Sequence, residues 1–234
     1  MISLPGKIIR WEYKGVPVSF FVNNPDDEIQ QHHNRGEFYE KDELAIIEQF
    51  FKPGDVYLDV GANIGNHLVY VGKCLMPAQM IVIEPNPPSL VILEANIDLN
   101  RLWRSVDLSL IGLGLSDDDH KAIAVIPGNN LGATRLERSN DENAIRVVRG
   151  DDVLGGRRID FIKMDVEGME LKALAGMTNL IGFNRPTMFI EVETANEVEF
   201  NSFVRSIGYI TKVKFKRYFQ NENYLIIPAE KISD

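Results

Sequence analysis

A glycine-rich turn follows directly after an apolar run that has the composition of a strand. The run is Val56–Val60, with a carboxylate at Asp59, and the turn is Gly61–Gly65. A helix should begin near Asn66. A strand, a glycine turn and a helix in this order place unpaired backbone N–H groups and the positive end of a helix dipole at the carboxyl edge of a sheet. Nucleotide-like ligands commonly bind at that edge, so the turn is the first candidate binding site.

The spacing of the glycines limits the ligand. A dinucleotide-binding turn reads G-x-G-x-x-G, whereas Ala62, Asn63 and Ile64 separate Gly61 from Gly65. A phosphate-cradling loop needs a G-K-[ST] sequence, which this turn lacks. The turn therefore favours a cofactor that has an adenosine but no phosphates, and S-adenosylmethionine is the common one.

A second carboxylate supports this interpretation. Glu84 ends the apolar run Met80–Ile83, about twenty residues after the turn, which is the offset at which a carboxylate contacts ribose hydroxyls. The alternative is a surface acid at the end of a strand, facing solvent.

Two motifs resemble those of one family. Val60–Gly65 resembles the first motif of the FkbM-type methyltransferases, a branch of the Rossmann-like methyltransferases that use S-adenosylmethionine. The stretch Lys163–Glu170 resembles the Lys-x-Asp-Val-Glu-Gly-x-Glu signature of the same family. The motifs occur in the order and at the distance that the family predicts, and the resemblance covers roughly residues 37–228.

The resemblance implies an α/β fold of the Rossmann-like class I methyltransferases. Such a fold has a seven-stranded, mostly parallel sheet with an antiparallel last strand. We expect one compact domain over residues 37–234, an N-terminal β-hairpin extension within residues 1–36, and a β-hairpin insertion over residues 121–149. The expected main strands cover residues 56–60, 80–84, 106–113, 159–164, 187–192, 209–215 and 223–227, and the expected helices cover residues 41–51, 66–75, 89–99, 170–175 and 197–207.

The resemblance also suggests cofactor contacts outside the glycine turn. A G-x-x-Tyr-Glu-like element, here with Tyr39 and Glu40, is expected to close over the cofactor, although a packing tyrosine and a helix-start glutamate are equally compatible with it. Ser116 and Asp117 leave the third strand where relatives contact adenine, and a solvated turn is the alternative. The complete set of expected cofactor contacts is Tyr39, Glu40, Asp59, Gly61, Ala62, Asn63, Gly65, Glu84, Ser116, Asp117 and Asp165.

Methyl transfer from a sulfonium depends mainly on holding the acceptor in line with the breaking bond. A carboxylate that touched the sulfonium would stabilise the ground state more than the transition state. We therefore assign Asp59 to the amino-acid end of the cofactor and Glu84 to its ribose. If the acceptor is a hydroxyl, a base adds about 10²- to 10⁴-fold to the rate. The candidate bases, in order of preference, are Asp165, Glu167, Glu191 and His67.

Some candidates also have a structural explanation. Glu167 and Glu170 could simply favour the start of a helix, and a histidine at a helix start, such as His67, is more often structural. His32 and His33 precede the Tyr39 element and could reach an acceptor pocket, but no spacing supports a metal site. In the insertion, we expect Asn130 and Thr134 to contact acceptor or cofactor, although segments of this composition also form ordinary turns.

Composition narrows the class of protein. A net charge of -9 opposes binding to nucleic acid, and no apolar run approaches the roughly 18 residues of a membrane span. One cysteine, Cys74, excludes an internal disulfide. We expect a cytoplasmic O-methyltransferase acting on a sugar, glycan or small natural product, with the oxygen acceptor implied only by the resemblance. The alternatives are a non-catalytic adenosyl-cofactor-binding module and, disfavoured by the glycine spacing, an NAD-dependent oxidoreductase. The sequence does not indicate an oligomeric state.

Overall fold

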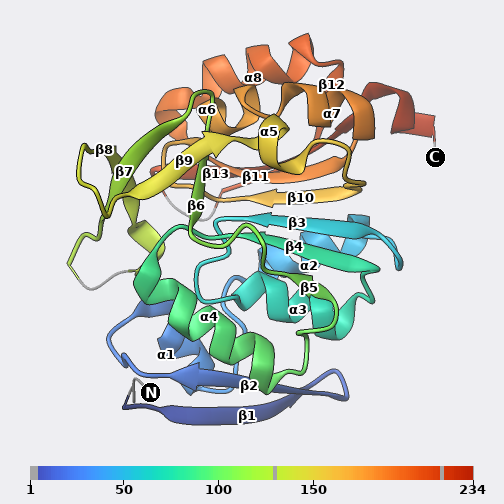
Figure 1. Ribbon diagram of the computed structural model, residues 1–234. Coiled ribbons are helices and arrows are strands. Elements are labelled where there is room, and N and C mark those ends of the chain that lie inside the picture. Colours follow the sequence, from blue (N-terminus) through green and yellow to red (C-terminus); the bar gives the residue numbers. More distant parts are fainter. Residues whose placement is uncertain (1–4, 129–130, 217–218, 234) are drawn as a thin grey trace.

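The computed structural model describes residues 5–128, 131–216 and 219–233, and a sheet of seven strands lies at its centre (Figure 1). The strand order within the described residues is β12-β13-β11-β10-β3-β4-β5. Neighbouring strands run parallel except around β13, which is antiparallel to both β11 and β12. The strands are β3 (Val56–Val60), β4 (Gln79–Ile83), β5 (Val106–Asp107), β10 (Phe161–Met164), β11 (Thr187–Glu193), β12 (Tyr209–Phe215) and β13 (Asn221–Pro228).

The order of the strands creates a switch point between β3 and β10. From β3 the chain proceeds through β4 to one edge of the sheet, and it then returns to build the other half from β10. Open α/β sheets bind ligands at the carboxyl ends of the strands that flank such a switch point. The fold therefore brings the glycine turn after β3 beside the Asp165 loop after β10.

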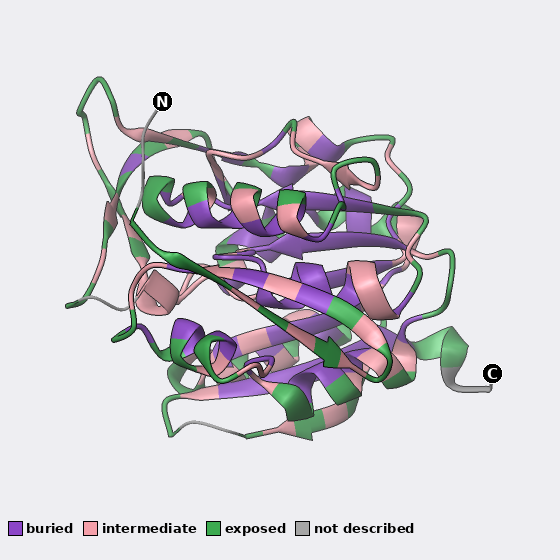
Figure 2. Ribbon diagram, turned by 90° about the horizontal axis from the view of Figure 1, so that it is seen from below, coloured by how far each residue is buried: buried purple, intermediate pink, exposed green. Residues whose placement is uncertain are grey.

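Helices cover both faces of the sheet. One face carries α2 (Lys41–Phe50), α3 (Asn66–Cys74) and α4 (Pro87–Leu99), and the other carries α5 (Gly150–Leu154), α6 (Glu170–Ala175), α7 (Thr178–Asn184) and α8 (Glu197–Ser206) (Figure 1). All five residues of β3 are buried, and the central strands are purple in Figure 2. Strands buried on both faces form from continuous apolar runs, which is why the sequence located these strands well.

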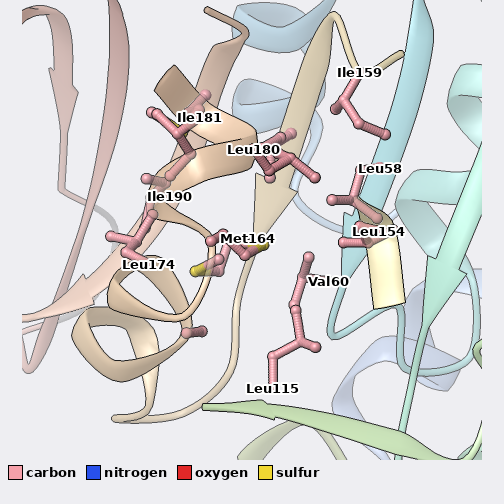
Figure 3. Packing of buried hydrophobic residues seen from close by; sticks show 14 of the residues in the cluster. Leu58, Val60, Leu115, Leu154, Ile159, Met164, Leu174, Leu180, Ile181 and Ile190 are labelled. Carbon is pink, nitrogen blue, oxygen red and sulfur yellow. The ribbon is translucent and has the colours of Figure 1, made fainter. Parts of the chain in front are cut away.

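Alternate residues of β3 enter two different apolar clusters. Leu58 and Val60 belong to the cluster that includes Met164 of β10 and Leu174 of α6 (Figure 3). Tyr57 belongs to the opposite cluster, which is formed with α2 and α3. The two clusters hold the strand in place from both sides, so the turn at its end has a rigid base.

The N-terminal hairpin is present as expected. It pairs β1 (Lys7–Tyr13) with β2 (Val16–Val22), and it is followed by a helix that the sequence analysis did not predict, α1 (Glu28–Asn34). The side chain of Asn100, the C-cap residue of α4, bonds both backbone groups of Ser19 on the edge of β2 that faces α4. The division into an N-terminal extension (residues 1–36) and one compact domain (residues 37–234) stays a prediction.

Two expectations about the sheet are wrong. The third strand was expected over residues 106–113, but β5 ends at Asp107, whose side chain accepts a hydrogen bond from the backbone N–H of Ser109 at 2.8 Å and turns the chain. After Gly112, which has a φ of 80°, the chain enters a second sheet. The insertion is therefore more than a hairpin. This second sheet has the order β6-β9-β7-β8 and consists of β6 (Leu113–Ser116), β7 (His120–Val125), β8 (Arg135–Arg138) and β9 (Ile145–Arg149).

The remaining described elements are three short 3-10 helices. They are η1 (Leu131–Ala133), η2 (Thr194–Asn196) and η3 (Ala229–Ser233).

Candidate functional site

The glycine turn packs directly against the loop after β10. Gly61 has a φ of 79°, and a Cβ atom at this position would lie 1.8 Å from the carbonyl oxygen of Asp165. The backbone N–H of Gly61 also donates to the carbonyl of Ile83 at 2.9 Å. A left-handed backbone in such close contact admits only glycine, so the sequence of the turn is explained by its packing as well as by ligand binding.

Two adjoining cavities open at this edge of the sheet. Their volumes are about 430 Å³ and about 60 Å³, and both are lined by Gly61, Asn63, Gly132, Asp165 and Glu167. The larger cavity is also lined by Glu28, Ile29, Tyr39, Glu40, Ala62, Ile64, Asn66, His67, Ala133, Lys163, Glu191, Phe219, Gln220 and Asn221. The smaller cavity is also lined by Val60, Ile83, Glu84, Pro85, Gly114, Leu115, Leu131, Thr134, Leu136, Val166 and Met169.

Glu84 lies in the wall of the smaller cavity, only 5% exposed. Its Oε2 accepts a hydrogen bond from the backbone N–H of Asn63 at 2.7 Å, and its Oε1 accepts one from the backbone N–H of Asn86 at 2.8 Å. Burial raises the pKa of Glu84 to about 7, although these two hydrogen bonds oppose the shift. Each carboxylate oxygen has a further lone pair, so the group can still accept hydrogen bonds from a ligand diol.

The buried ammonium of Lys163 lies among carboxylates. Its Nζ donates to the carbonyl of Gly61 at 2.9 Å and lies 3.7 Å from both Asp59 Oδ1 and Asp165 Oδ2. Desolvation lowers the pKa of Lys163, but Asp165 and Asp59 reverse the effect, so the pKa is raised. Burial raises the pKa of Asp59 to about 6, against the opposing charge of Lys163. Lys163 therefore joins the glycine turn to the Asp165 loop.

Three acids after β10 and on β11 face the larger cavity. They are Asp165, Glu167 and Glu191. Burial, and then the charge of Asp165, raise the pKa of Glu167 to about 9 and that of Glu191 to about 8. At neutral pH these raised pKa values favour the protonated form of both glutamates, so neither is the preferred base.

Another part of the lining of the larger cavity comes from the segment before α2. Tyr39 and Glu40 line it, and Glu40 has a left-handed backbone with a φ of 56°. Burial, followed by the charge of Asp165, raises the pKa of Glu40 well above its usual value. His67 Nε2 lies 3.8 Å from Glu40 Oε2. Two titratable groups from separate elements therefore meet across the start of α3.

Comparison with known proteins agrees with this geometry. A family model described as the methyltransferase FkbM domain matches residues 59–217. The chain belongs to the FkbM methyltransferase family. The match includes both the glycine turn and the Asp165 loop, and it extends through the second sheet to the end of β12.

Individual relatives are more distant. The chain is 29% identical over 175 residues to the hexuronic acid methyltransferase AglP of Haloferax volcanii, covering 73% of this chain and 68% of that protein. It is 26% identical over 150 residues to Methyltransferase 1 of Beauveria bassiana, covering 53% of this chain and 59% of that protein. The solved structure of methyltransferase FkbM from Methylobacillus flagellatus aligns with a TM-score of 0.54 at 19% identity, over 84% of this chain and 52% of that chain. The chain thus spans about half of that solved FkbM chain, and the likeness to it shows a shared fold.

Most of the expected site residues lie together. Eleven of them line one or both cavities: Tyr39, Glu40, Gly61, Ala62, Asn63, His67, Glu84, Thr134, Asp165, Glu167 and Glu191. Thr134 Oγ1 donates to the carbonyl of Leu131 at 2.7 Å and accepts from Asn86 Nδ2 at 3.2 Å. Asn130 lies outside the described residues.

Other expected residues lie outside the cavity walls. Asp59 is fully buried, and its Oδ1 lies 3.7 Å from Lys163 Nζ, so its carboxylate acts on the cavity through Lys163. Gly65 caps α3. Ser116 is buried and donates to Asp117 Oδ1 at 3.0 Å, while Asp117 is exposed. Gly114 and Leu115, just before them, line the smaller cavity instead.

The two consecutive histidines on α1 also lie outside the cavity walls. His33 is buried, and desolvation lowers its pKa to about 4, so it is neutral at physiological pH. His32 stacks edge-on with Tyr39, with ring centroids 5.3 Å apart. Across the part of the chain that the structure describes, no grouping of three His, Cys, Asp or Glu side chains is arranged to hold a metal ion.

Several cavity residues could not be predicted from the sequence. Lys163 was noted only as part of a motif, and Asn66 only as the start of a helix, although both side chains line the larger cavity. The turn Phe219–Asn221 between β12 and β13 forms another wall, with Phe219 90% exposed at the rim. A polar residue inside an apolar strand was the available signal for Lys163; no local pattern marks the others, because a distant part of the fold places them.

Proposed function

We propose that this FkbM family member transfers a methyl group from S-adenosylmethionine to a hydroxyl oxygen of a sugar or a similar polyhydroxylated small molecule. The observation that carries the proposal is the pair of adjoining cavities that share the glycine turn and Asp165. Methyl transfer involves two ligands, a donor and an acceptor. Adjoining cavities suit it, because the donor must extend from its adenosine site toward the acceptor.

The residues present fit the proposed cofactor. Glu84 is placed to accept hydrogen bonds from ribose hydroxyls, and the smaller cavity has apolar walls for adenine from Leu115, Leu136 and Val166. The larger cavity is rich in carboxyl groups, which suits the α-ammonium group at the amino-acid end. When bound, S-adenosylmethionine supplies an electrophilic methyl group on a positively charged sulfur.

The acceptor side of the larger cavity is polar. Glu167, Glu191 and Asn221 can bond hydroxyl groups of an acceptor, and the two glutamates serve as donors because their pKa values are raised to about 9 and about 8. Asp165 is the proposed base that takes the hydroxyl proton. A sugar acceptor is also supported by the relative named as a hexuronic acid methyltransferase.

Transfer of a labelled methyl group tests the proposal. The purified protein would be incubated with methyl-labelled S-adenosylmethionine and a panel of neutral hexosides, hexuronic acid glycosides and small phenols. Label should appear on an oxygen of at least one glycoside, and Asp165→Asn should reduce it. Binding of S-adenosylhomocysteine without transfer to any acceptor would favour a non-catalytic cofactor-binding module instead.

Two further properties remain predictions. Within residues 5–128, 131–216 and 219–233, no helix is long and apolar enough to cross a membrane. The cytoplasmic location expected from the sequence stays a prediction, which cell fractionation tests. A small-molecule or carbohydrate acceptor, rather than nucleic acid, likewise stays a prediction and is tested by the same methyl-transfer panel.

A further inference from the structure

One side chain bonds both backbone groups of a residue in the cavity wall. Asn66 Oδ1 accepts a hydrogen bond from the backbone N–H of Tyr39 at 3.0 Å, and Asn66 Nδ2 donates to the carbonyl of Tyr39 at 3.0 Å. Asn66 is only 4% exposed and directly follows the glycine turn as the first residue of α3. The glycine turn and the Tyr39–Glu40 segment are therefore joined at two points.

The same amide also reaches the N-terminal extension. His33 Nε2 lies 3.0 Å from Asn66 Oδ1. The two bonds to Tyr39 fix which end of the amide is the oxygen, so His33 must donate from Nε2 and carry its proton there. The lowered pKa of His33 is consistent with this neutral form, and its ring stacks on Phe20 of β2 with centroids 3.8 Å apart. Asn66 thus connects the hairpin extension, the Tyr39 segment and the glycine turn.

The contacts of the next residue in each segment show what this connection positions. Glu40 follows Tyr39, His67 follows Asn66, and the Glu40 carboxyl lies 3.8 Å from His67 Nε2. Glu40 has a left-handed backbone, its side chain is only 14% exposed, and it lies close to the charge of Asp165. Backbone strain and a buried carboxyl persist only where the surrounding structure fixes them, and the two bonds from Asn66 to the preceding residue supply that constraint.

We infer that Asn66 is a positioning residue of the methyl-transfer site, which holds Tyr39 and Glu40 over the amino-acid end of the cofactor. The inference rests on the proposed function. Glu84 and the smaller cavity take the adenosine, so the amino-acid end extends into the larger cavity, where Glu40 lies. On this inference, the N-terminal extension contributes to the cofactor site through His33.

The chain provides a matched control for this inference. Asn100 is also 4% exposed and bonds both backbone groups of Ser19, with Oδ1 accepting at 3.0 Å and Nδ2 donating at 2.6 Å. It holds the outer hairpin and lines neither cavity. Asn66→Ala and Asn100→Ala therefore remove the same kind of two-point contact, one at the site and one away from it.

The experiment compares two ligands by calorimetry. S-adenosylhomocysteine has the amino-acid part, whereas 5′-methylthioadenosine has the adenosine and the sulfur without it. Asn66→Ala should weaken binding of S-adenosylhomocysteine by about tenfold or more and leave binding of 5′-methylthioadenosine unchanged. Asn100→Ala should change neither affinity, although both variants should unfold at lower temperature than the wild type.

Other outcomes separate the inference from the proposed function. Equal weakening of both ligands by Asn66→Ala, or equal effects of the two variants, would mean that Asn66 only supports the fold, and so would unchanged affinities. If Asn66→Ala does not fold, Asn66→Asp is judged by the same criteria, because it keeps the oxygen acceptor and removes the donor to Tyr39. A wild-type protein that binds neither ligand would reject the proposed function itself.

Discussion

Glu84 Oε2 accepts a hydrogen bond from the backbone N–H of Asn63 at 2.7 Å. This contact joins the end of β4 to the glycine turn after β3, so the two features that first suggested an adenosine site form a single unit. The sequence analysis allowed Glu84 to face solvent, whereas in the structure it is 5% exposed and bonded to two backbone N–H groups. The residue therefore supports the turn as well as the proposed ribose contact.

Replacing Glu84 should weaken both cofactor binding and folding. Glu84→Gln keeps the size but leaves one buried N–H without an acceptor, which costs about 1–3 kcal/mol of unfolding free energy. Loss of the charged acceptor for ribose hydroxyls should weaken S-adenosylhomocysteine binding by about ten- to a hundredfold. Calorimetry should be done near pH 8, because the pKa of Glu84 is raised to about 7.

The control for Glu84→Gln is another buried carboxyl. Glu222 on β13 is 8% exposed, pairs with Lys214 at 2.9 Å and lines neither cavity. Glu222→Gln should leave affinity for S-adenosylhomocysteine unchanged. If Glu84→Gln also binds normally, the ribose is held elsewhere.

Asp165→Asn should reduce methyl transfer by about 10²-fold or more while leaving cofactor affinity largely intact. Asn has the size of Asp but cannot take a proton, and the neighbouring Glu167 and Glu191 are mainly protonated at neutral pH because their pKa values are raised to about 9 and about 8. Single-turnover rates and calorimetric affinities would be measured together. Asp160→Asn is the control, because Asp160 lies at the opposite end of β10, where it accepts from the backbone N–H of Val56 at 2.8 Å.

Two results would reject this role. Normal turnover by Asp165→Asn would remove Asp165 as the base and direct attention to His67. Loss of cofactor binding would instead place Asp165 in the cofactor site.

Stability of the unliganded protein should fall as pH rises from about 4.5 toward 9. The pKa of Glu167 is raised to about 9 in the folded protein, whereas that of an unfolded glutamate is about 4.3. Between these values the folded state keeps a proton that the unfolded state has lost, so stability decreases with increasing pH. Glu191, with a pKa raised to about 8, contributes in the same direction.

Urea unfolding at about pH 6 and about pH 8.5 checks this sign. The wild type should be less stable at the higher pH, and Glu167→Gln should show a smaller difference because one titrating group is gone. A wild type whose stability does not fall over this interval would contradict the raised pKa values of these carboxyls.

Gly61→Ala should destabilise the protein much more than a comparable substitution elsewhere. At Gly61 the new Cβ atom would lie 1.8 Å from the carbonyl oxygen of Asp165, whereas at Gly112 nothing lies within 4 Å, and φ is 79° and 80° at the two sites. The left-handed backbone alone costs about 1–2 kcal/mol for an alanine. In denaturant unfolding, the loss of unfolding free energy should be larger for Gly61→Ala than for Gly112→Ala by roughly 2 kcal/mol or more. Equal losses would mean that the turn can move away from the Asp165 loop.

The sequence predicted the central strands well, because β3, β4, β10 and β11 are mostly apolar runs that are largely buried on both faces. The prediction failed where a local polar contact sets the direction of the chain. Residues 106–113 alternate like a strand, but the Asp107 side chain bonds the backbone N–H of Ser109 and is held by Arg157. The helix α1 has a single buried apolar residue, Ile29, and depends on Asp27, which accepts from the backbone N–H of Gln30 at 2.9 Å.

The site was predictable to the extent that its residues lie in motifs. The glycine turn, Glu84 and the Asp165 loop come to one edge of the sheet because parallel strands end there. Asn66 could not be recognised, because its partners Tyr39 and His33 lie 27 and 33 residues earlier in the chain. Ser116 and Asp117 were chosen on the assumption of a longer third strand, and the early end of β5 brings Gly114 and Leu115 to the cavity instead.

Thermal unfolding with S-adenosylhomocysteine and with NAD⁺ decides whether the cavities at the glycine turn bind an adenosyl cofactor or a dinucleotide. A ligand at about 100 times its dissociation constant stabilises the folded state by about 2.7 kcal/mol. In a protein of this size, that corresponds to a rise in Tm of about 5–10 °C. We expect this rise with S-adenosylhomocysteine and little change with NAD⁺. An equal rise with NAD⁺, or no rise with either S-adenosylmethionine or S-adenosylhomocysteine, would contradict it.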